Sequence, residues 1–135
     1  MLRRSVCLSA FPVLLMCVLN CLFAETAEIE RGRYLVHNVA KCVECHSPRN
    51  AQGELDRTRL LQGAPIPLKS PYRDTQWAFR APAIAGLPGW AVEDVIHLLM
   101  TGSRQSGWTP RPPMPQFGMS REDASSVVAY LKSLH

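Results

Sequence analysis

The run Cys42-Val43-Glu44-Cys45-His46 restricts what this chain can fold into more than any other feature of its sequence. Residues three positions apart lie on one face of a helix, so the thiols of Cys42 and Cys45 point the same way. They can add to the two vinyl groups along one edge of a haem, while His46 turns its imidazole toward the iron. This spacing is typical of c-type haem attachment. We therefore expect one covalent haem c, held by Cys42 and Cys45, with His46 as the proximal iron ligand.

Other uses of two cysteines at this spacing fit the sequence less well. A thioredoxin-like redox pair belongs in a βαβ unit, and no strong strand pattern precedes Cys42. A zinc site would need four ligands, with His37 as the fourth, but the adjacent side chains of Cys45 and His46 diverge on a helix. A disulfide between Cys42 and Cys45 would close a very small, strained loop that adds little stability.

An apolar segment at the N-terminus predicts export. Two arginines precede residues 6–23, which are almost entirely apolar, and the small residue Ala24 follows. This is the build of a secretory signal peptide, so we expect residues 1–24 to be cleaved. An uncleaved membrane anchor is the alternative, because a run of about 18 residues is near the lower limit for crossing a bilayer. In both cases we expect residues 25–135 to be periplasmic or otherwise exported.

The charge balance argues against a nucleic-acid partner. The whole chain has 15 basic and 11 acidic residues, a formal net charge of +4. Two of the arginines lie before the apolar run, so residues 25–135 carry 13 basic and 11 acidic residues, or +2. Aromatic residues make up only 7% of the chain, which is sparse for a module that stacks on bases. We expect no nucleic-acid binding, and membrane contact only if the N-terminal segment stays uncleaved.

Three amphipathic segments predict the main helices. Residues 28–40, residues 92–101 and the segment that follows Ser120 each carry apolar residues at helical spacing, with acidic residues near the first turn. Gly102 is a suitable stop for the second helix. Ser120 is a good N-cap for the third, with an acidic residue three positions later as in a weak capping box.

Two long segments between these helices are rich in proline and glycine. Residues 47–91 hold ten such residues, and residues 103–119 hold four prolines. Irregular stretches of this length need something to wrap around, and a large apolar macrocycle supplies that surface. The predicted fold is therefore all-α, one domain over residues 25–135, with three main helices and long loops wrapped around one haem.

The distal face of the iron has several candidate ligands in the sequence. Met114 lies in Pro112-Pro113-Met114-Pro115, where prolines fix the backbone and predict a rigid, extended loop that holds the thioether at a set distance. Met100 lies at an apolar helical spacing and Met119 just before the N-cap, so we expect both to pack in the core. The histidines are poorer candidates: His37 on the proximal side, His97 on a polar helix face, and His135 at the terminus.

Together these features resemble class I cytochrome c, over about residues 28 to 134. The cysteine-histidine motif, the Pro-Met-Pro loop and the last helix carry the resemblance. Residues 30–35, in the first expected helix, and residues 80–88, in the middle of the chain, look like the corresponding segments of small bacterial monohaem cytochromes. Similar domains occur as electron-accepting subunits of periplasmic or membrane dehydrogenases.

The resemblance implies further details. Histidine and methionine would bind the iron from its two faces, and the oxidised protein would show a weak sulfur-to-iron absorption band in the far red. The first and last helices would cross at a small residue, for which Gly32 is the candidate, facing Tyr130 or Leu131.

The sequence also departs from the family pattern. Family members usually have a proline about a dozen residues after the haem histidine, whose carbonyl accepts a hydrogen bond from the imidazole, but position 58 is Thr. We expect a carbonyl within residues 63–65 to take that role. The haem propionates are expected to find arginine or indole partners. The candidates are Arg57, Arg59, Arg73, Arg80 and Trp77.

These features favour a one-electron carrier rather than an enzyme. Ligation by His46 and Met114 fills both axial positions of the iron, and no Ser, Cys or carboxylate pair forms a catalytic pattern. Its partners would be redox proteins, a dehydrogenase as donor or a terminal oxidase as acceptor. Two alternatives remain: a five-coordinate haem protein that binds a small ligand or peroxide, and the electron-transfer subunit of a membrane or periplasmic dehydrogenase.

Overall fold

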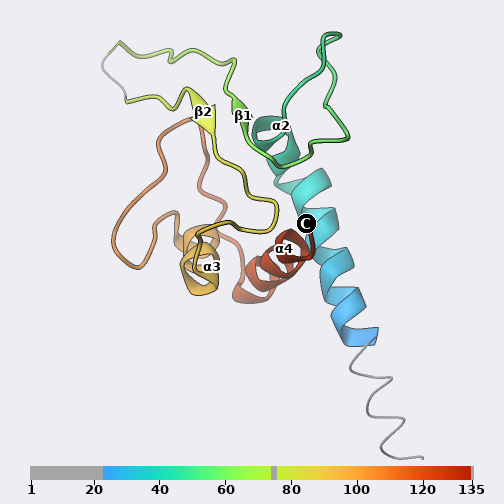
Figure 1. Ribbon diagram of the computed structural model, residues 1–135. Helices are drawn as coiled ribbons and strands as arrows, with labels where there is room; N and C mark the ends of the chain where they lie inside the picture. Colours follow the sequence, from blue (N-terminus) through green and yellow to red (C-terminus); the bar gives the residue numbers. More distant parts are fainter. Residues whose placement is uncertain (1–22, 74–75, 135) are drawn as a thin grey trace, which may run out of the picture.

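A computed structural model describes residues 23–73 and 76–134 (Figure 1). Residues 23–34 are α-helical and continue into η1, a single π-helical turn over Leu35–Val39. The short helix α2, Cys42–His46, follows after a break. The predicted helix over residues 28–40 is therefore present but starts earlier, and its last turn is wider. Only a small part of the expected signal peptide, residues 23–24, lies within the described residues.

The second predicted helix is α3, Val92–Thr101, with the expected bounds. It ends at Gly102, which adopts the left-handed conformation with φ 83° and donates its N–H to the carbonyl of Leu98 at 2.8 Å. Glycine enters this conformation without a Cβ penalty, which explains the stop. The buried side of the helix includes Val95, Ile96 and Leu99.

The third predicted helix is α4, Arg121–Ser133. The hydroxyl oxygen of Ser120 caps its start by accepting a hydrogen bond from the backbone N–H of Asp123 at 3.1 Å. The carboxylate of Asp123 pairs with Arg31 at 3.0 Å, which joins the start of α4 to the N-terminal helix.

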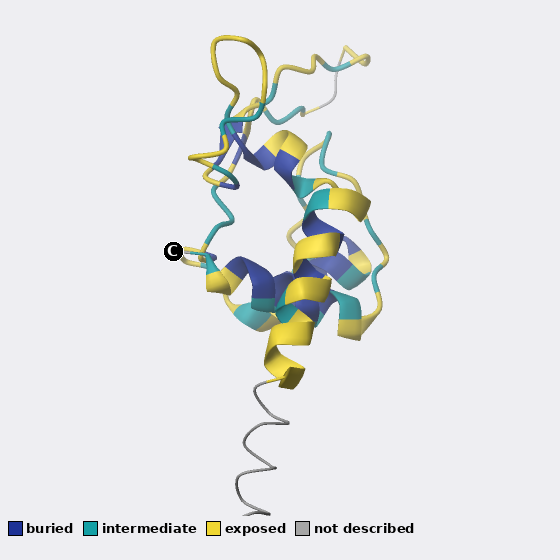
Figure 2. Ribbon diagram, turned by 90° about the vertical axis from the view of Figure 1, so that its right-hand side faces the viewer, coloured by how far each residue is buried: buried dark blue, intermediate teal, exposed yellow. Residues whose placement is uncertain are grey.

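The N-terminal helix crosses α4 at Gly32, as the resemblance implied (Figure 1). A Cβ on this residue would overlap the carbonyl group of Ser126 and lie 2.8 Å from the Cβ of Tyr130. Only glycine allows this approach, because the two backbones are already in contact. Most of residues 23–34 is otherwise exposed (Figure 2).

The buried faces of η1, α3 and α4 form the core (Figure 2). Leu61 joins them from the first long loop and is 0% exposed. Apolar burial of this kind is the main contribution to the stability of the fold. Val43 of α2 also belongs to the core, which therefore supports the cysteine-histidine motif.

The first long loop contains the only strands among the described residues, β1 (Ala64–Pro65) and β2 (Arg80–Ala81). They pair antiparallel, with Ala64 opposite Ala81 and Pro65 opposite Arg80. The rest of residues 47–91 forms turns and irregular segments, so the chain is mostly helical with few strands. No helix within residues 23–73 and 76–134 is long and apolar enough to span a membrane.

Candidate haem-binding site

The cysteine-histidine motif forms its own short helix because the chain breaks just before it. Lys41 adopts the left-handed conformation, φ 51°, at the N-cap of α2. This ends the preceding helix and turns Cys42–His46 as a separate unit. Cys42 is half-buried, Cys45 is exposed and His46 is buried. The two cysteines carry free thiols and are not joined in a disulfide.

Burial changes the acid-base properties of this helix. Desolvation raises the pKa of the Cys42 thiol to about 11. Desolvation also lowers the pKa of His46, against an opposing hydrogen bond to Pro82. A neutral imidazole with Nδ1–H bonded to a carbonyl leaves Nε2 as the lone pair for a metal.

The hydrogen-bond acceptor for His46 is not where the sequence analysis placed it. Its Nδ1 donates to the carbonyl oxygen of Pro82 at 2.8 Å, so the expectation of a carbonyl within residues 63–65 is wrong. The pairing of β1 with β2 explains the change, because it brings the residue that follows β2 up to α2. The acceptor is still a proline carbonyl, but it lies 36 positions after the histidine.

Gly63 makes this arrangement possible. Its N–H donates to the carbonyl of His46 at 2.7 Å, and its φ of 81° is left-handed. A Cβ on Gly63 would lie 2.8 Å from the nitrogen of Ala83. The glycine therefore lets the chain pass closely between α2 and the segment that carries Pro82.

A cavity of about 630 Å³ opens in front of the motif. Cys42, Cys45 and His46 form one part of its wall, and Met114 forms another. The volume lies within the range of pockets that enclose small molecules and cofactors. Most of the remaining wall is apolar and comes from α3, α4 and both long loops. It includes Ile66, Ile84, Leu87, Val95, Leu99, Phe117, Val127 and Leu131.

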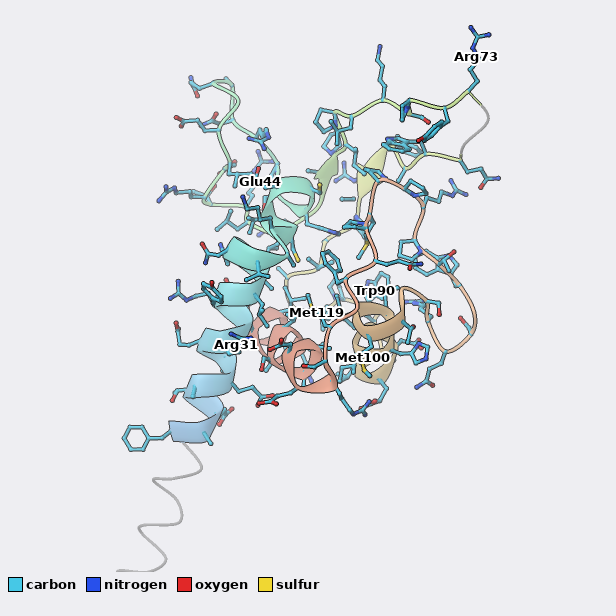
Figure 3. All side chains as sticks on the ribbon, turned by 180° about the vertical axis from the view of Figure 1, so that it is seen from behind. Arg31, Glu44, Arg73, Trp90, Met100 and Met119 are labelled. Atoms are coloured by element: carbon cyan, nitrogen blue, oxygen red, sulfur yellow. The ribbon has the colours of Figure 1, made fainter. Side chains whose placement is uncertain are left out.

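Met114 is the only one of the described distal candidates that lines this cavity. Met100, within α3, and Met119, just before α4, are partly buried against the core, as expected (Figure 3). His37 contacts the hydroxyl of Tyr130 at 2.8 Å, away from the cavity. His135 lies outside the described residues.

The structure corrects two smaller expectations. The loop at Met114 is not extended: it turns over Pro112 and Pro113, and the N–H of Met114 donates to the carbonyl of Arg111 at 3.4 Å. The carbonyl of Pro112 accepts from Ala78 at 2.7 Å, which joins the two long loops. His97, expected on a polar helix face and hence in solvent, is half-buried and bonds to the carbonyl of Ser103 at 2.7 Å.

Of the predicted propionate partners, Arg80 alone lines the cavity. Arg59 pairs with Asp56 at 2.7 Å, and hydrogen bonds from Thr58 and Arg59 hold the pKa of that carboxyl at about 2. The indole of Trp77 donates to the carbonyl of Leu68 at 2.8 Å. Arg57 and Arg73 are exposed and do not line the cavity.

The sequence did not single out several polar or aromatic residues of the wall, among them Trp90, Arg104, Trp108 and Arg111. The sequence did hold one indication of this part of the wall, the tryptophans Trp90 and Trp108 before and after α3. A tryptophan side chain needs a packing partner, so two of them predict an aromatic contact. Without the fold, nothing in the sequence brings them together.

The cavity fits a haem in its chemistry. Two thiols and a histidine lie together in its wall, and the lining is apolar where a macrocycle would pack. Four cationic residues line it, with no aspartate or glutamate among the described lining residues. One of those cations, Arg104, has a buried Nε with no hydrogen-bond partner. The propionates of a haem would supply the acceptors that the wall lacks. No group of three or more His, Cys, Asp or Glu suited to a metal ion occurs within the part of the chain that the structure describes.

Residues 29–135 match the cytochrome c family, which covers most of the chain. The chain belongs to the cytochrome c family. The motif, the mostly helical fold and the cavity agree with this assignment, which implies a covalent haem c as cofactor. The protein is thus an electron carrier of this family.

Several curated relatives are similar to this cytochrome. The fructose dehydrogenase cytochrome subunit of Gluconobacter japonicus is 32% identical over 114 residues, 77% of this chain and 21% of the relative. A nicotinate dehydrogenase subunit of Pseudomonas putida is 29% identical over 120 residues, 82% of this chain and 9% of the relative. A diheme cytochrome c-type protein of Cereibacter sphaeroides is 55% identical over 40 residues, 30% of this chain and 14% of the relative. The chain therefore spans about a fifth or less of the length of each of these relatives.

Proposed function

We propose that this cytochrome transfers single electrons through a haem bound by four side chains. Cys42 and Cys45 attach the haem by thioether bonds, His46 is the proximal iron ligand, and Met114 is the distal ligand. When bound, the haem supplies an iron that gains and loses one electron. The observation that carries the proposal is that all four side chains line one cavity, although Met114 lies far from the motif in sequence.

The protein's own residues set the conditions for electron transfer. The carbonyl of Pro82 fixes the imidazole of His46 in one orientation and one tautomer. The mostly apolar lining would give a bound haem surroundings of low polarity. The thioether of Met114 is a soft, neutral ligand, which favours the reduced, less charged iron and raises the reduction potential.

Replacing Met114 tests the distal ligand. Met114→Ala should remove the sulfur-to-iron band of the oxidised protein, lower the midpoint potential and open the iron to carbon monoxide or cyanide. Met100→Leu and Met119→Leu are matched controls, because Leu preserves their packing against the core. Both should keep the band and the potential of the wild-type protein.

Carbon monoxide binding distinguishes this proposal from a ligand-binding haem protein. A filled sixth position should make the reduced wild-type protein bind carbon monoxide slowly or not at all. Rapid, stoichiometric binding would show an open sixth position, and the five-coordinate function would replace electron transfer as the conclusion.

We also propose that the electron donor is a dehydrogenase. The support comes from two relatives that are subunits of dehydrogenases. Most of this chain aligns with each of them. The test uses purified dehydrogenases from the source organism, each supplied with its own substrate. At least one of them should reduce the haem of this cytochrome rapidly, and a catalytically dead variant of that enzyme should not. Equal reduction by both would contradict a dehydrogenase donor.

We further propose that residues 1–24 direct export and that the mature cytochrome works in the periplasm. The two arginines and the apolar run support this. N-terminal sequencing of the natural protein should give a start near Glu25. A chain that keeps Met1 and stays with membranes would instead support an uncleaved anchor.

A further inference from the structure

The guanidinium of Arg104 packs against two indoles that meet at an angle. Its Cζ lies 4.0 Å from the ring centroid of Trp90 and 5.3 Å from that of Trp108. The two indoles meet edge to face, with centroids 6.3 Å apart. Trp90 lies beside α3 (Figure 3), and the arginine and Trp108 come from the loop after that helix. Cation–π attraction to both indoles restricts the arginine to one orientation.

The backbone around Arg104 is fixed as well. Its N–H donates to the carbonyl of Trp108 at 2.8 Å, and its carbonyl accepts from Gly107 at 2.9 Å. These bonds close a tight loop that brings the arginine and the indole to the same place. The arginine is therefore positioned before any cofactor binds.

This fixed arginine lacks an acceptor. Among the buried side-chain nitrogen and oxygen atoms of the described residues, its Nε alone has no hydrogen-bond partner. A buried donor without an acceptor costs free energy, so native proteins rarely keep one without a purpose. Arg104 lines the haem cavity, whose described wall contains no aspartate or glutamate. A carboxylate that enters the cavity would supply the missing acceptor.

We infer that Arg104, clamped by Trp90 and Trp108, binds a haem propionate and keeps it ionised over the working pH range of the cytochrome. A guanidinium presents parallel N–H donors that match a carboxylate. Lys41, Arg80 and Arg111 also line the cavity, but all three are exposed, so water screens their charges. The inference rests on the proposed electron-carrier function. It assigns propionate binding to a residue of the second long loop, whereas the candidates expected from the sequence lie in the first long loop.

The pair has a consequence for the reduction potential. An ionised propionate near the iron favours the oxidised state, and a guanidinium bound to that propionate cancels its charge. Without the guanidinium, the propionate gains and loses its proton within an accessible pH range. The potential then falls as the pH rises, because deprotonation adds a negative charge near the iron.

The experiment is redox titration of the holoprotein at several pH values from about 5 to 8. We expect Arg104→Gln to have a lower midpoint potential than the wild-type protein at the alkaline end and nearly the same potential at the acidic end. Arg104→Lys should recover part of the difference, because it restores the charge without the fork of donors. Arg57→Gln, which removes an exposed arginine outside the cavity, is the matched control and should follow the wild-type curve.

The sulfur-to-iron band separates this inference from the distal-ligand proposal. Arg104→Gln should keep the band, because Met114 is unchanged. A variant with the band, but with the wild-type potential at every pH, would overturn the inference and leave the proposed function intact. If Arg104→Gln yields no holoprotein, Trp108→Leu takes its place, since Trp108 is 48% exposed and its loss removes one of the two rings that hold the arginine. A partial shift in the same direction would support the inference, and an unchanged pH profile would overturn it.

Discussion

The imidazole Nδ1 of His46 lies 2.8 Å from the carbonyl oxygen of Pro82, so the haem histidine is held by a segment far along the chain. This contact depends on three features: the pairing of β1 with β2, the close approach at Gly63, and the N–H of that glycine bonded to the carbonyl of His46. The orientation of the proximal ligand is therefore coupled to the packing of the first long loop. Substitutions in that loop should therefore alter the absorption spectrum of the bound haem.

Gly63→Ala should destabilise the protein by two separate effects. The substituted residue must adopt φ 81°, which costs about 1–2 kcal/mol for any residue with a Cβ. It must also displace the segment at Ala83, an overlap that costs about 1–3 kcal/mol more. The measurement is the free energy of unfolding by denaturant, together with the absorption spectrum of the oxidised haem.

Gly53→Ala is the matched control for Gly63→Ala. Gly53 has nearly the same φ, 82°, but a Cβ there would meet nothing within 4 Å. This variant should lose only the conformational part of the stability and keep the wild-type haem spectrum. Equal losses in the two variants would show that the approach at Gly63 does not constrain the position of Pro82.

The sign of the change in unfolding free energy caused by Gly32→Ala tests the helix crossing. Helix propensity alone predicts a gain of up to about 1 kcal/mol, because Ala favours a helix interior over Gly. The overlap with the Ser126 carbonyl and the Tyr130 Cβ predicts a loss of about 1–3 kcal/mol. We expect the loss in denaturant unfolding. A stabilised variant would mean that the two helices do not meet at this residue.

The helices could be predicted from the sequence because their signals are local. Gly102 stops α3 at the expected residue, and Ser120 caps α4 through the N–H of Asp123. The motif could be assigned to a haem from its spacing, and Met114 is favoured as the distal candidate because of its proline-rich loop and the poorer alternatives; all four side chains line one cavity. These predictions use only neighbours in sequence or the needs of the cofactor.

The errors concern contacts between distant segments. The acceptor for His46 depends on a strand pairing of only two residues on each side, too short to leave a periodic pattern. The position of Arg104 depends on Trp90, which lies on the other side of α3. The carbonyl of Pro112, in the turn before Met114, accepts a hydrogen bond from the N–H of Ala78 in the other long loop. None of these pairs is encoded by spacing along the chain.

His37 should make the stability depend on pH. Burial, with a smaller effect from the charge of Arg33, lowers its pKa in the folded protein below the ordinary value of about 6.5. The unfolded chain then binds a proton more readily than the folded one, so the free energy of unfolding should fall as the pH drops below about 6.5. Above that pH both states hold a neutral imidazole, and this contribution is fully present.

His37→Gln isolates that effect. Glutamine does not titrate, so the unfolding free energy of the variant should vary less with pH between about 6.5 and 5 than that of the wild-type protein. Its amide can still meet the hydroxyl of Tyr130, which limits other changes at the helix crossing. An identical pH dependence in both proteins would assign the acid sensitivity to other groups.

Both cysteines should hold the haem covalently, and Cys42 should in addition contribute to the stability of the fold. The wild-type haem should survive denaturation in acid acetone, because thioether bonds do not release it, and the intact mass should include one haem. Cys42→Ala and Cys45→Ala should each assemble less holoprotein, with the remaining thioether still resistant to extraction. Replacing both should leave no haem that resists acid acetone. Cys42→Ala should also lower the unfolding free energy more than Cys45→Ala, because Cys42 packs against the core and Cys45 is exposed. Haem that is fully extractable from the wild-type protein would contradict covalent attachment at this motif.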